Sequence, residues 1–375
     1  MVRSLRRPSS PLPPAPARRP QPRWKTRTSS PRYSSASHRG GPLSPAPALV
    51  CKRWHHLVSD PEFVRRFRAH HQTPSLHGFF LRNGTIIPTQ EPPGRLPTKR
   101  FSIVQWDGDI GEAIGSGWLV LGCRDGRVLC ENNEGYLVFD PITGDRIRLP
   151  FSTGPRQSPS FAAATVISNV DGSDRRSFRL VELFIKNLYN YSVQLQSSVY
   201  SSDSGVWADL DADLILPSSD WSVHHSTLIG DAIYWLLQGC GILQIDLKGQ
   251  RLTFIEQPPD VSVHHGFKCR IRQTEGHRLG LAVLVEPSIQ IWQREDDLSD
   301  AAKWVLHKTV RLDNFLPKWP KERIWPLGIM TISEETDVIF LWTHFGPFMV
   351  HLESMSSKKV FGKMPIKNIY PYSSF

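Results

Sequence analysis

Residues 119–150 decide the fold and read LVLGCRDGRVLCENNEGYLVFDPITGDRIRLP. Short apolar runs alternate in this stretch with turn residues, and Asp125-Gly126 lies between LGCR and RVLC. An Asp-Gly pair between two apolar runs is a strong signal for a two-residue hairpin, because both turn positions require a positive φ angle. The stretch therefore predicts consecutive antiparallel strands joined by tight turns.

The same pattern continues from Leu76 towards the C-terminus. Apolar runs of four to eight residues recur there, bounded by Gly, Pro, Asn and Asp. No capped helix of more than about ten residues is indicated among them, which argues against β-α-β units and a parallel sheet. The sequence therefore predicts an all-β, antiparallel architecture.

A repeated unit supports a more specific prediction. It consists of a strand that ends in a polar turn and a second strand with an aromatic or basic residue, and its copies lie 44 to 62 residues apart. The shorter spacings are typical of propeller blades. We therefore predict a kelch-like β-propeller of about six blades over residues 76–370. The first blade should begin at HGFFLR (77–82) and be closed by strands near the C-terminus, because closure hides the sheet edges. The five copies are FDPITGDRIRLP (139–150), VYSSDSGVWADL (199–210), QIDLKGQRLTFI (244–255), IWQREDDLSDAAKWVL (291–306) and VHLESMSSKKVF (350–361).

Half of the 12 tryptophans recur about once per predicted blade. Large aromatic side chains at such a spacing are expected to pack between blades, with stacking on a ligand as the alternative. These residues are Trp118, Trp207, Trp235, Trp292, Trp304 and Trp342.

The net charge of +10 originates in residues 1–48. They contain ten Lys and Arg but no Asp or Glu, so residues 49–375 carry 35 charges of each sign. A neutral folded body does not favour a groove that tracks phosphates, and we expect no nucleic acid partner. No run approaches the roughly 18 apolar residues of a membrane span, so we expect no membrane association.

Residues 1–48 are expected to form a disordered basic tail. They hold 11 of the 31 prolines and show little apolar periodicity. Two alternatives remain open, an organellar transit peptide, whose helix the prolines oppose, and a basic arm for nucleic acid. The five cysteines, an odd number without two-residue spacing, favour a reducing compartment. We therefore expect a cytoplasmic or nuclear protein, with organellar targeting as the alternative.

The stretch LVCKRWHHLVSDPEFVRRFRAHH (49–71) predicts two short helices within residues 49–75. In the first, apolar side chains lie on adjoining faces. Residues 59–62 then predict the end of the first helix and the start of the second, because Ser59 and Glu62 have the spacing of a capping box. On these facts alone, a helical pair that merely packs on the next domain is an equal alternative.

This stretch, with LHGFFLRNG (76–84) after it, resembles the second half of an F-box and its junction to the C-terminal domain of plant-type F-box proteins. The strings DPITG (140–144), VYSSDSGVW (199–207) and GDAIYWL (230–236) resemble the F-box-associated domain of the same family. The F-box positions that match are Cys51, Lys52, Trp54, Leu57, Asp60, Pro61 and Phe63.

The resemblance implies a substrate receptor of an SCF-type cullin-RING ubiquitin ligase. In such proteins the F-box holds a Skp-type adaptor, and the C-terminal domain holds a target protein, which is unknown here. The chain itself would then perform no covalent step. The adaptor contact would fall on Leu49, Val50, Cys51, Trp54 and Leu57.

The leucine-rich segment that opens an F-box, of the form LPxxLLxxILxRLP, has no counterpart in residues 1–48. With permissible codons, the neighbouring reading frame of residues 22–48 can encode EMEDEDLLAALLLRLPPRRPSLPRA, which contains such a segment. We therefore hypothesise that residues 1–48 are a frame-shifted translation of the missing half. The chain as written should bind the adaptor weakly or not at all, because half of the apolar contact surface is lost.

The sequence offers no signature of catalysis. It has no Gly-x-Ser-x-Gly elbow, and Gly111, Gly115 and Gly117 lack the spacing of a phosphate-binding loop. We therefore expect no catalytic residue, no cofactor and no metal. Histidine pairs on a strand point to opposite faces, and the acidic cluster in 295–300 lacks calcium-loop positions. The four histidine pairs are His55-His56, His70-His71, His224-His225 and His264-His265.

Two cysteines flank the Asp125-Gly126 turn. A regular hairpin sets Cys123 opposite Val128 and Cys130 opposite Leu121, which would make the two thiols diagonal neighbours in the core. We expect both of them to be reduced.

Target recognition is expected in loops at one mouth of the propeller, where rigid strands position variable segments. The alternative to a ligase receptor is a free-standing propeller that binds a partner, and a propeller enzyme ranks third. The candidate loops are Arg124–Arg127, Ser201–Gly205, Gln238–Gly241 and Gln293–Asp300.

Overall fold

Short strands joined by tight turns account for nearly all of the described secondary structure, in six antiparallel sheets. The computed structural model describes residues 62, 66, 70, 75–88, 117–152, 162–168, 177–188, 192–210, 214–217, 223–237, 241–259, 261, 268–295, 302–312, 316, 328–333, 338–343, 346–360 and 369–374. All of them belong to one compact unit, His55–Phe375.

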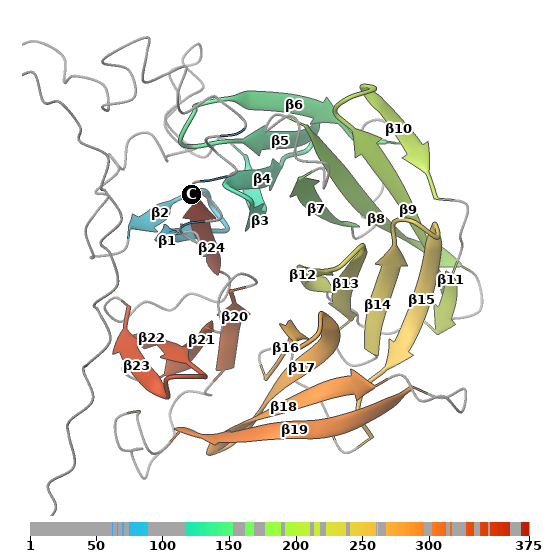
Figure 1. Cartoon of the computed structure of the whole chain (residues 1–375). Coiled ribbons are helices and arrows are strands. Elements are labelled where there is room, and N and C mark those ends of the chain that lie inside the picture. The colour runs from blue at the N-terminus through green and yellow to red at the C-terminus, as the bar shows by residue number, and fades with distance from the viewer. Residues whose placement is uncertain are drawn as a thin grey trace, which may run out of the picture. The chain divides into compact units, whose positions relative to one another are not determined.

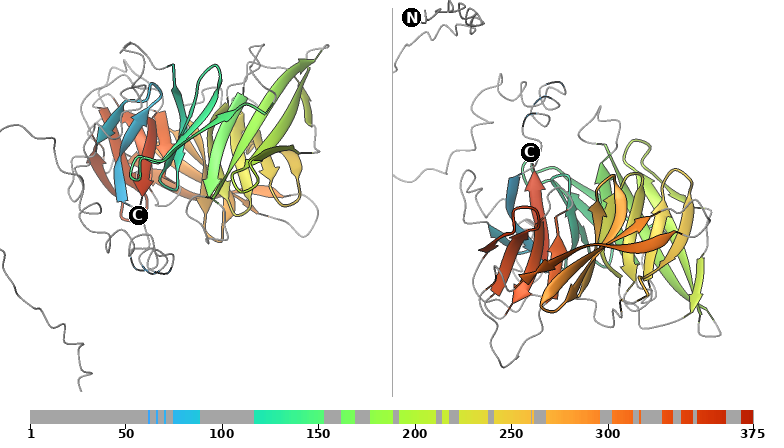
Figure 2. Two further views of the ribbon diagram at one scale, coloured as in Figure 1. Left: turned by 90° about the horizontal axis from the view of Figure 1, so that it is seen from above. Right: turned by 60° about the horizontal axis from the view of Figure 1, so that its bottom comes forward.

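The six sheets are arranged radially around a central axis, as the blades of a propeller (Figure 1). Two further views show the same sheets side by side around the ring (Figure 2). The all-β, antiparallel propeller predicted from the sequence is therefore confirmed, with six blades.

The blades follow one another along the chain, and most contain four strands in sequence order from the centre outwards. Blade 2 contains β3 (Leu119–Arg124), β4 (Arg127–Glu131), β5 (Gly135–Phe139) and β6 (Arg146–Pro150). Blade 3 contains β7 (Ala162–Ser168), β8 (Phe178–Leu188), β9 (Ser192–Ser201), β10 (Val206–Asp209) and β11 (Leu214–Pro217). Blade 4 contains β12 (Val223–Ile229), β13 (Ala232–Leu237), β14 (Gly241–Asp246) and β15 (Arg251–Glu256).

Two more blades complete the series of four-stranded sheets. Blade 5 contains β16 (Cys269–Thr274), β17 (Arg278–Val285), β18 (Ser288–Glu295) and β19 (Lys303–Arg311). Blade 6 contains β20 (Gly328–Ile332), β21 (Val338–Thr343), β22 (Gly346–His351) and β23 (Ser356–Lys359).

Blade 1 joins the two ends of the propeller. It consists of β2 (Ile86–Pro88), β1 (Ser75–Leu81) and β24 (Ile369–Ser374), in this order from the outside to the centre. β1 and β24 pair antiparallel from Ser75 opposite Ser374 to Leu81 opposite Ile369. The C-terminal strand thus supplies the inner edge of the first blade, as predicted for a ring that begins at HGFFLR.

Each of the five repeated sequence units forms the third and fourth strands of one blade, from blade 2 to blade 6. Their turns explain part of the repetition. Asp140 accepts hydrogen bonds from the amides of Ile142 and Thr143 at 2.8 and 3.2 Å. Asp246 accepts from Lys248 and Gly249 at 2.9 and 3.0 Å, and these bonds lower the pKa of its carboxyl group. An aspartate at the start of the turn therefore fixes the hairpin in both blades.

The Asp125-Gly126 turn has φ angles of 52° and 75°, as a two-residue hairpin of type I′ requires. Cys123 lies opposite Val128, as expected, but Cys130 lies opposite Val120 rather than Leu121. The register shifts between Val120 and Gly122, because a bulge places one extra residue in β3. A bulge cannot be seen in the hydrophobic pattern alone, which is why the predicted pairing of Cys130 was wrong.

The described residues form six hydrophobic core clusters, and each cluster fills the space between two neighbouring blades. The tryptophans named above contribute to these clusters, so their predicted packing role is confirmed. Trp235 is 1% exposed and packs between blades 3 and 4. The distribution is less even than expected, because blade 5 contains both Trp292 and Trp304, while the described part of blade 1 contains none.

Within the two helices predicted before the propeller, the structure describes three residues. Glu62, Arg66 and His70 are helical and exposed, and the Arg66 guanidinium donates a hydrogen bond to the Glu62 carboxylate. The basic tail, residues 1–48, and the first predicted helix lie outside the described residues. Among the described residues, no helix has the length and apolarity to cross a membrane.

Candidate recognition site in the central channel

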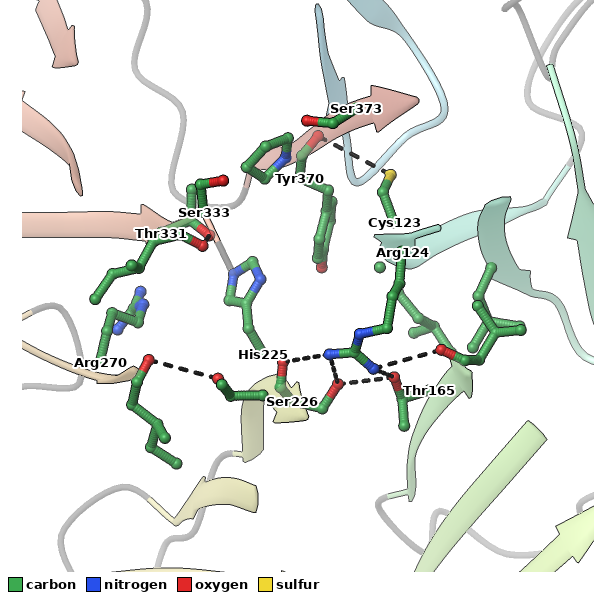
Figure 3. A pocket seen from close by; sticks show the side chains of 18 of the residues that line it. Cys123, Arg124, Thr165, His225, Ser226, Arg270, Thr331, Ser333, Tyr370 and Ser373 are labelled. Carbon is green, nitrogen blue, oxygen red and sulfur yellow. Dashed lines mark hydrogen bonds between the residues drawn. The ribbon is translucent and has the colours of Figure 1, made fainter. Parts of the chain in front are cut away.

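The inner strands of the six blades surround a hollow on the propeller axis. Every blade contributes lining residues from its innermost strand: β24, β3, β7, β12, β16 and β20. The hollow has a cavity volume of about 90 Å³. The lining combines apolar side chains with polar groups, which are hydroxyls, two guanidinium groups, an imidazole and a phenol (Figure 3).

Arg124 crosses from blade 2 to the next two blades at the channel wall. It ends β3, and its Nη1 atom donates to the Thr165 hydroxyl at 2.6 Å and to the Val166 carbonyl at 3.4 Å. Its Nη2 atom donates to the carbonyl and the hydroxyl of Ser226 at 3.1 and 3.4 Å. The Ser226 and Thr165 hydroxyls also bond to each other at 2.8 Å. One guanidinium group thus joins the inner strands of blades 2, 3 and 4.

Arg270 supplies a second cation from blade 5 and is only 4% exposed. Its Nε atom donates to the Met330 carbonyl of β20 at 3.2 Å, and its Nη1 atom donates to the Cys269 carbonyl at 2.7 Å. Burial lowers the pKa of the Arg270 guanidinium to about 10. The group therefore still carries its charge at neutral pH.

Tyr370 and His225 approach each other across the channel, with ring centroids 4.8 Å apart. Burial raises the pKa of the Tyr370 phenol to about 12, so the phenol stays neutral at physiological pH. The Cys123 sulfur lies 4.0 Å from the Tyr370 carbonyl oxygen, and burial raises the pKa of this thiol well above its usual value. A protonated thiol is a weak nucleophile, so Cys123 lacks the activation that covalent catalysis requires.

The lining has a positive charge balance. Among the described lining residues, it contains two guanidinium groups, those of Arg124 and Arg270, but one acid, Asp125. The Asp125 carboxylate accepts a hydrogen bond from the amide of Ser168 at 3.3 Å. Charges act more strongly in a confined, poorly solvated space than at an open surface. The channel is therefore suited to attract an anionic group.

The positions predicted for adaptor binding, Leu49, Val50, Cys51, Trp54 and Leu57, all lie outside the described residues. Their assignment stays a prediction.

The four candidate loops do not open on the same face. Strands alternate in direction, so turns after the first and third strands of a blade lie on one face, and turns after the second strand lie on the other. Arg124–Arg127 and Ser201–Gly205 therefore share a face. Gln293–Asp300 follows a third strand and belongs with them, although 296–300 lie outside the described residues. Gln238–Gly241 follows a second strand and opens on the opposite face, with 238–240 outside the described residues.

Sequence reasoning identified Arg124 and Asp125 as loop residues but missed the other channel residues. Arg270, Tyr370 and Thr331 come from three different blades. The one signal they share is a polar side chain in the innermost strand of a blade, and a search for apolar runs does not detect it. Within the described part of the chain, no group of three His, Cys, Asp or Glu could hold a metal ion.

Two buried thiols allow a test of the packing between blades. Cys130 and Cys269 are fully buried, and burial raises the pKa of both, that of Cys269 to about 12. We expect both to react with iodoacetamide at pH 8 at least about tenfold more slowly in the folded chain than in guanidinium, because only the thiolate reacts. Peptide mass spectrometry measures the rates, and equal rates in the two states would contradict this packing.

Comparison with known proteins agrees with the fold. The family described as F-box protein AT5G49610-like, beta-propeller, matches residues 119–373. Two proteins of Arabidopsis thaliana, named "Putative F-box protein At3g23950" and "Putative F-box protein At3g23970", are 23% and 24% identical over 205 residues. These alignments cover 50% of this chain and 48% of each relative, so the chain spans about half the length of the curated relatives it matches.

Solved structures resemble the chain only loosely. A structural genomics protein of unknown function from Bacteroides thetaiotaomicron has a TM-score of 0.40 at 10% identity, over 68% of this chain and 62% of the other. An oligogalacturonate lyase in complex with manganese has a TM-score of 0.37 at 9% identity, over 66% and 65%. The sequence match over 119–373, together with the six-bladed ring, shows that this chain belongs to the family of AT5G49610-like F-box proteins with a β-propeller.

Proposed function

We propose that this protein is the substrate-recognition subunit of an SCF-type cullin-RING ubiquitin ligase. The family match over the propeller carries this proposal, because F-box proteins are named for the segment that joins a receptor to the ligase. The propeller holds a target protein, and the preceding helices hold a Skp-type adaptor. The chain acts by proximity, since it keeps a lysine of the target near the ubiquitin-loaded partner and takes part in no bond-forming step.

The propeller has the properties of a rigid receptor. Pairing of β1 with β24 closes the ring, and the interblade cores formed by the described residues fix the blades to one another. Turns and the channel mouth can therefore vary in sequence while their positions are kept. We place target binding at the face that contains the turns Arg124–Arg127 and Ser201–Gly205, next to the channel residues described above.

Adaptor binding is assigned to Leu49, Val50, Cys51, Trp54 and Leu57, which match the second half of an F-box. The leucine-rich first half is absent from residues 1–48. We therefore propose that full affinity requires the leucine-rich segment that the neighbouring reading frame can encode with permissible codons. We also propose a cytoplasmic or nuclear location, which a fluorescent fusion of the whole chain would test.

A pull-down with a purified Skp-type adaptor tests the assignment. Two full-length chains are compared, the chain as written and a version in which EMEDEDLLAALLLRLPPRRPSLPRA replaces residues 22–48. We expect the rebuilt chain to retain at least about tenfold more adaptor, because the second half of the apolar contact is restored. Two substitutions in the rebuilt chain serve as controls. Trp54→Ala should reduce the amount of adaptor retained, whereas Arg66→Ala, at an exposed position, should leave it unchanged.

A free-standing propeller without ligase association is the second candidate. The missing leucine-rich segment favours it, because a chain with half an F-box has no complete adaptor contact. Adaptor retention by neither chain in the pull-down would support this candidate and contradict the ligase assignment.

A further inference from the structure

Positive charge lines both sides of the channel. Arg124 lies on the blade 2 side, Arg270 lies on the blade 5 side, and His225 lies between them (Figure 3). Arg124 is held by hydrogen bonds to β7 and β12, and Arg270 is held by bonds to backbone carbonyls. Both charges are therefore fixed in place before any ligand arrives, so a ligand does not have to order them.

Hydroxyl groups from several blades complete the lining. Such groups donate hydrogen bonds to anionic oxygens, and a carboxylate accepts up to four of them. A guanidinium group adds charge to the same kind of contact, which strengthens it roughly twofold. Three lining hydroxyls already donate within the protein: Ser226 to the Thr165 hydroxyl, and Thr227 and Thr331 to the carbonyls of Ile271 and Ile332. The donors to a ligand would therefore be the hydroxyls of Thr165, Ser333, Tyr370 and Ser373.

The size of the channel limits what can enter it. Its cavity volume of about 90 Å³ suits a small terminal group better than a hairpin, whose two strands lie about 4.8 Å apart. An internal segment of a target would have to place the chain on both sides of the inserted residue at the channel. A chain terminus needs room for a single strand. The C-terminus also carries a carboxylate, which is ionised at neutral pH.

We propose that the central channel is a pocket for the terminal carboxylate of a target polypeptide, with Arg124 and Arg270 as the source of positive charge. This proposal rests on the assignment of target binding to the propeller and names the class of target. Capture of a terminal carboxylate is a recurring mode of peptide recognition. The opposite end of a chain is disfavoured, because an ammonium group would meet two fixed cations and one carboxylate, that of Asp125.

The test uses the purified full-length chain without any adaptor, so its result is independent of the pull-down. Two fluorescent peptide pools, each with eight randomised positions, end in a free carboxylate or in a carboxamide. We expect the immobilised chain to retain the free-acid pool at least about tenfold more than the amide pool. Equal retention of the two pools, or retention of neither, would overturn the proposal.

A matched pair of serines in blade 6 provides the variants. Ser333 lines the channel, and Ser354 lies exposed in the outer turn of the same blade. Ser333→Asp adds a negative charge to the pocket and should abolish the preference for the free-acid pool, whereas Ser354→Asp should leave it unchanged. Loss of the preference in both variants, or in neither, would contradict a site in the channel. Circular dichroism checks that both variants fold, and Ser373→Asp provides a second channel variant from β24.

Free small acids share the same chemistry and form a separate arm of the experiment. Glutarate is added to the full-length chain and to Ser333→Asp, and the melting temperature is measured. If the proposal holds, glutarate at millimolar concentration competes with the free-acid pool without exceeding its affinity. If glutarate stabilises the chain in a Ser333-dependent manner while neither peptide pool is retained, the pocket belongs to a free small acid, and the polypeptide assignment is wrong.

Discussion

Tyr372→Ala is expected to lower the free energy of unfolding of the propeller by about 3–5 kcal/mol, the range for removal of a fully buried aromatic ring. Tyr372 is 0% exposed and lies in β24, the strand that closes the ring. Its ring packs edge-on against Phe80 at a centroid distance of 5.6 Å. Its hydroxyl donates to the carbonyl of Gly126, in the first hairpin of blade 2, at 3.1 Å. One side chain thus joins the last strand to both the first and the second blade.

Tyr372→Phe is the matched control. It keeps the ring and removes only the hydrogen bond to Gly126, so a loss of about 1 kcal/mol is expected. Guanidinium unfolding of the full-length chain, followed by tryptophan fluorescence, measures both variants. If the alanine variant were no less stable than the phenylalanine variant, β24 would not hold the ring closed in solution.

The second large effect is expected for Trp235→Ala. Trp235 lies in β13, is 1% exposed, and packs in the core between blades 3 and 4 with residues such as Leu183 and Leu195. Its removal leaves a cavity that the surrounding strands cannot fill, and we expect a loss of about 3–5 kcal/mol. The measurement is the same unfolding transition.

Trp304→Ala provides the contrast. Trp304 lies in the outer strand of blade 5, is only partly buried, and donates from its indole nitrogen to the Glu256 carbonyl at 2.8 Å. Because most of the lost contact is at the surface, a loss of about 1 kcal/mol is expected. If the two tryptophan variants were equally destabilised, the cores between blades would not carry the stability of the ring.

The two parts of the proposed function, adaptor binding and target binding, are tested by independent experiments. The adaptor experiment depends on helices before the propeller, while the peptide experiment depends on residues within its channel. A chain that binds free-acid peptides but no adaptor would be a free-standing recognition module. A chain that binds adaptor but shows no preference for the carboxylate would be a ligase receptor that uses its outer loops.

Much of the fold could be predicted because it is local. Asp125-Gly126 needs two positive φ angles, so it specifies its hairpin wherever it occurs in a β-rich chain. Asp140 and Asp246 bind amides two and three residues ahead, which fixes the turns that repeat in two blades. The five repeated units account for blades 2 to 6, and the need to close the ring adds the first blade. Pairing of Cys130 could not be predicted, because the bulge in β3 changes the register without changing the apolar pattern.

By itself, the sequence determined the strands, their turns, the number of blades and the closure by the C-terminal strand, because each depends on chemistry within a few neighbouring residues or on the need to cover sheet edges. Only the tertiary structure decided which residues meet in the channel. Arg124, His225 and Arg270 lie in separate blades and come together because the ring places the innermost strand of every blade around one axis. Convergence of this kind depends on radial packing, which no local pattern records.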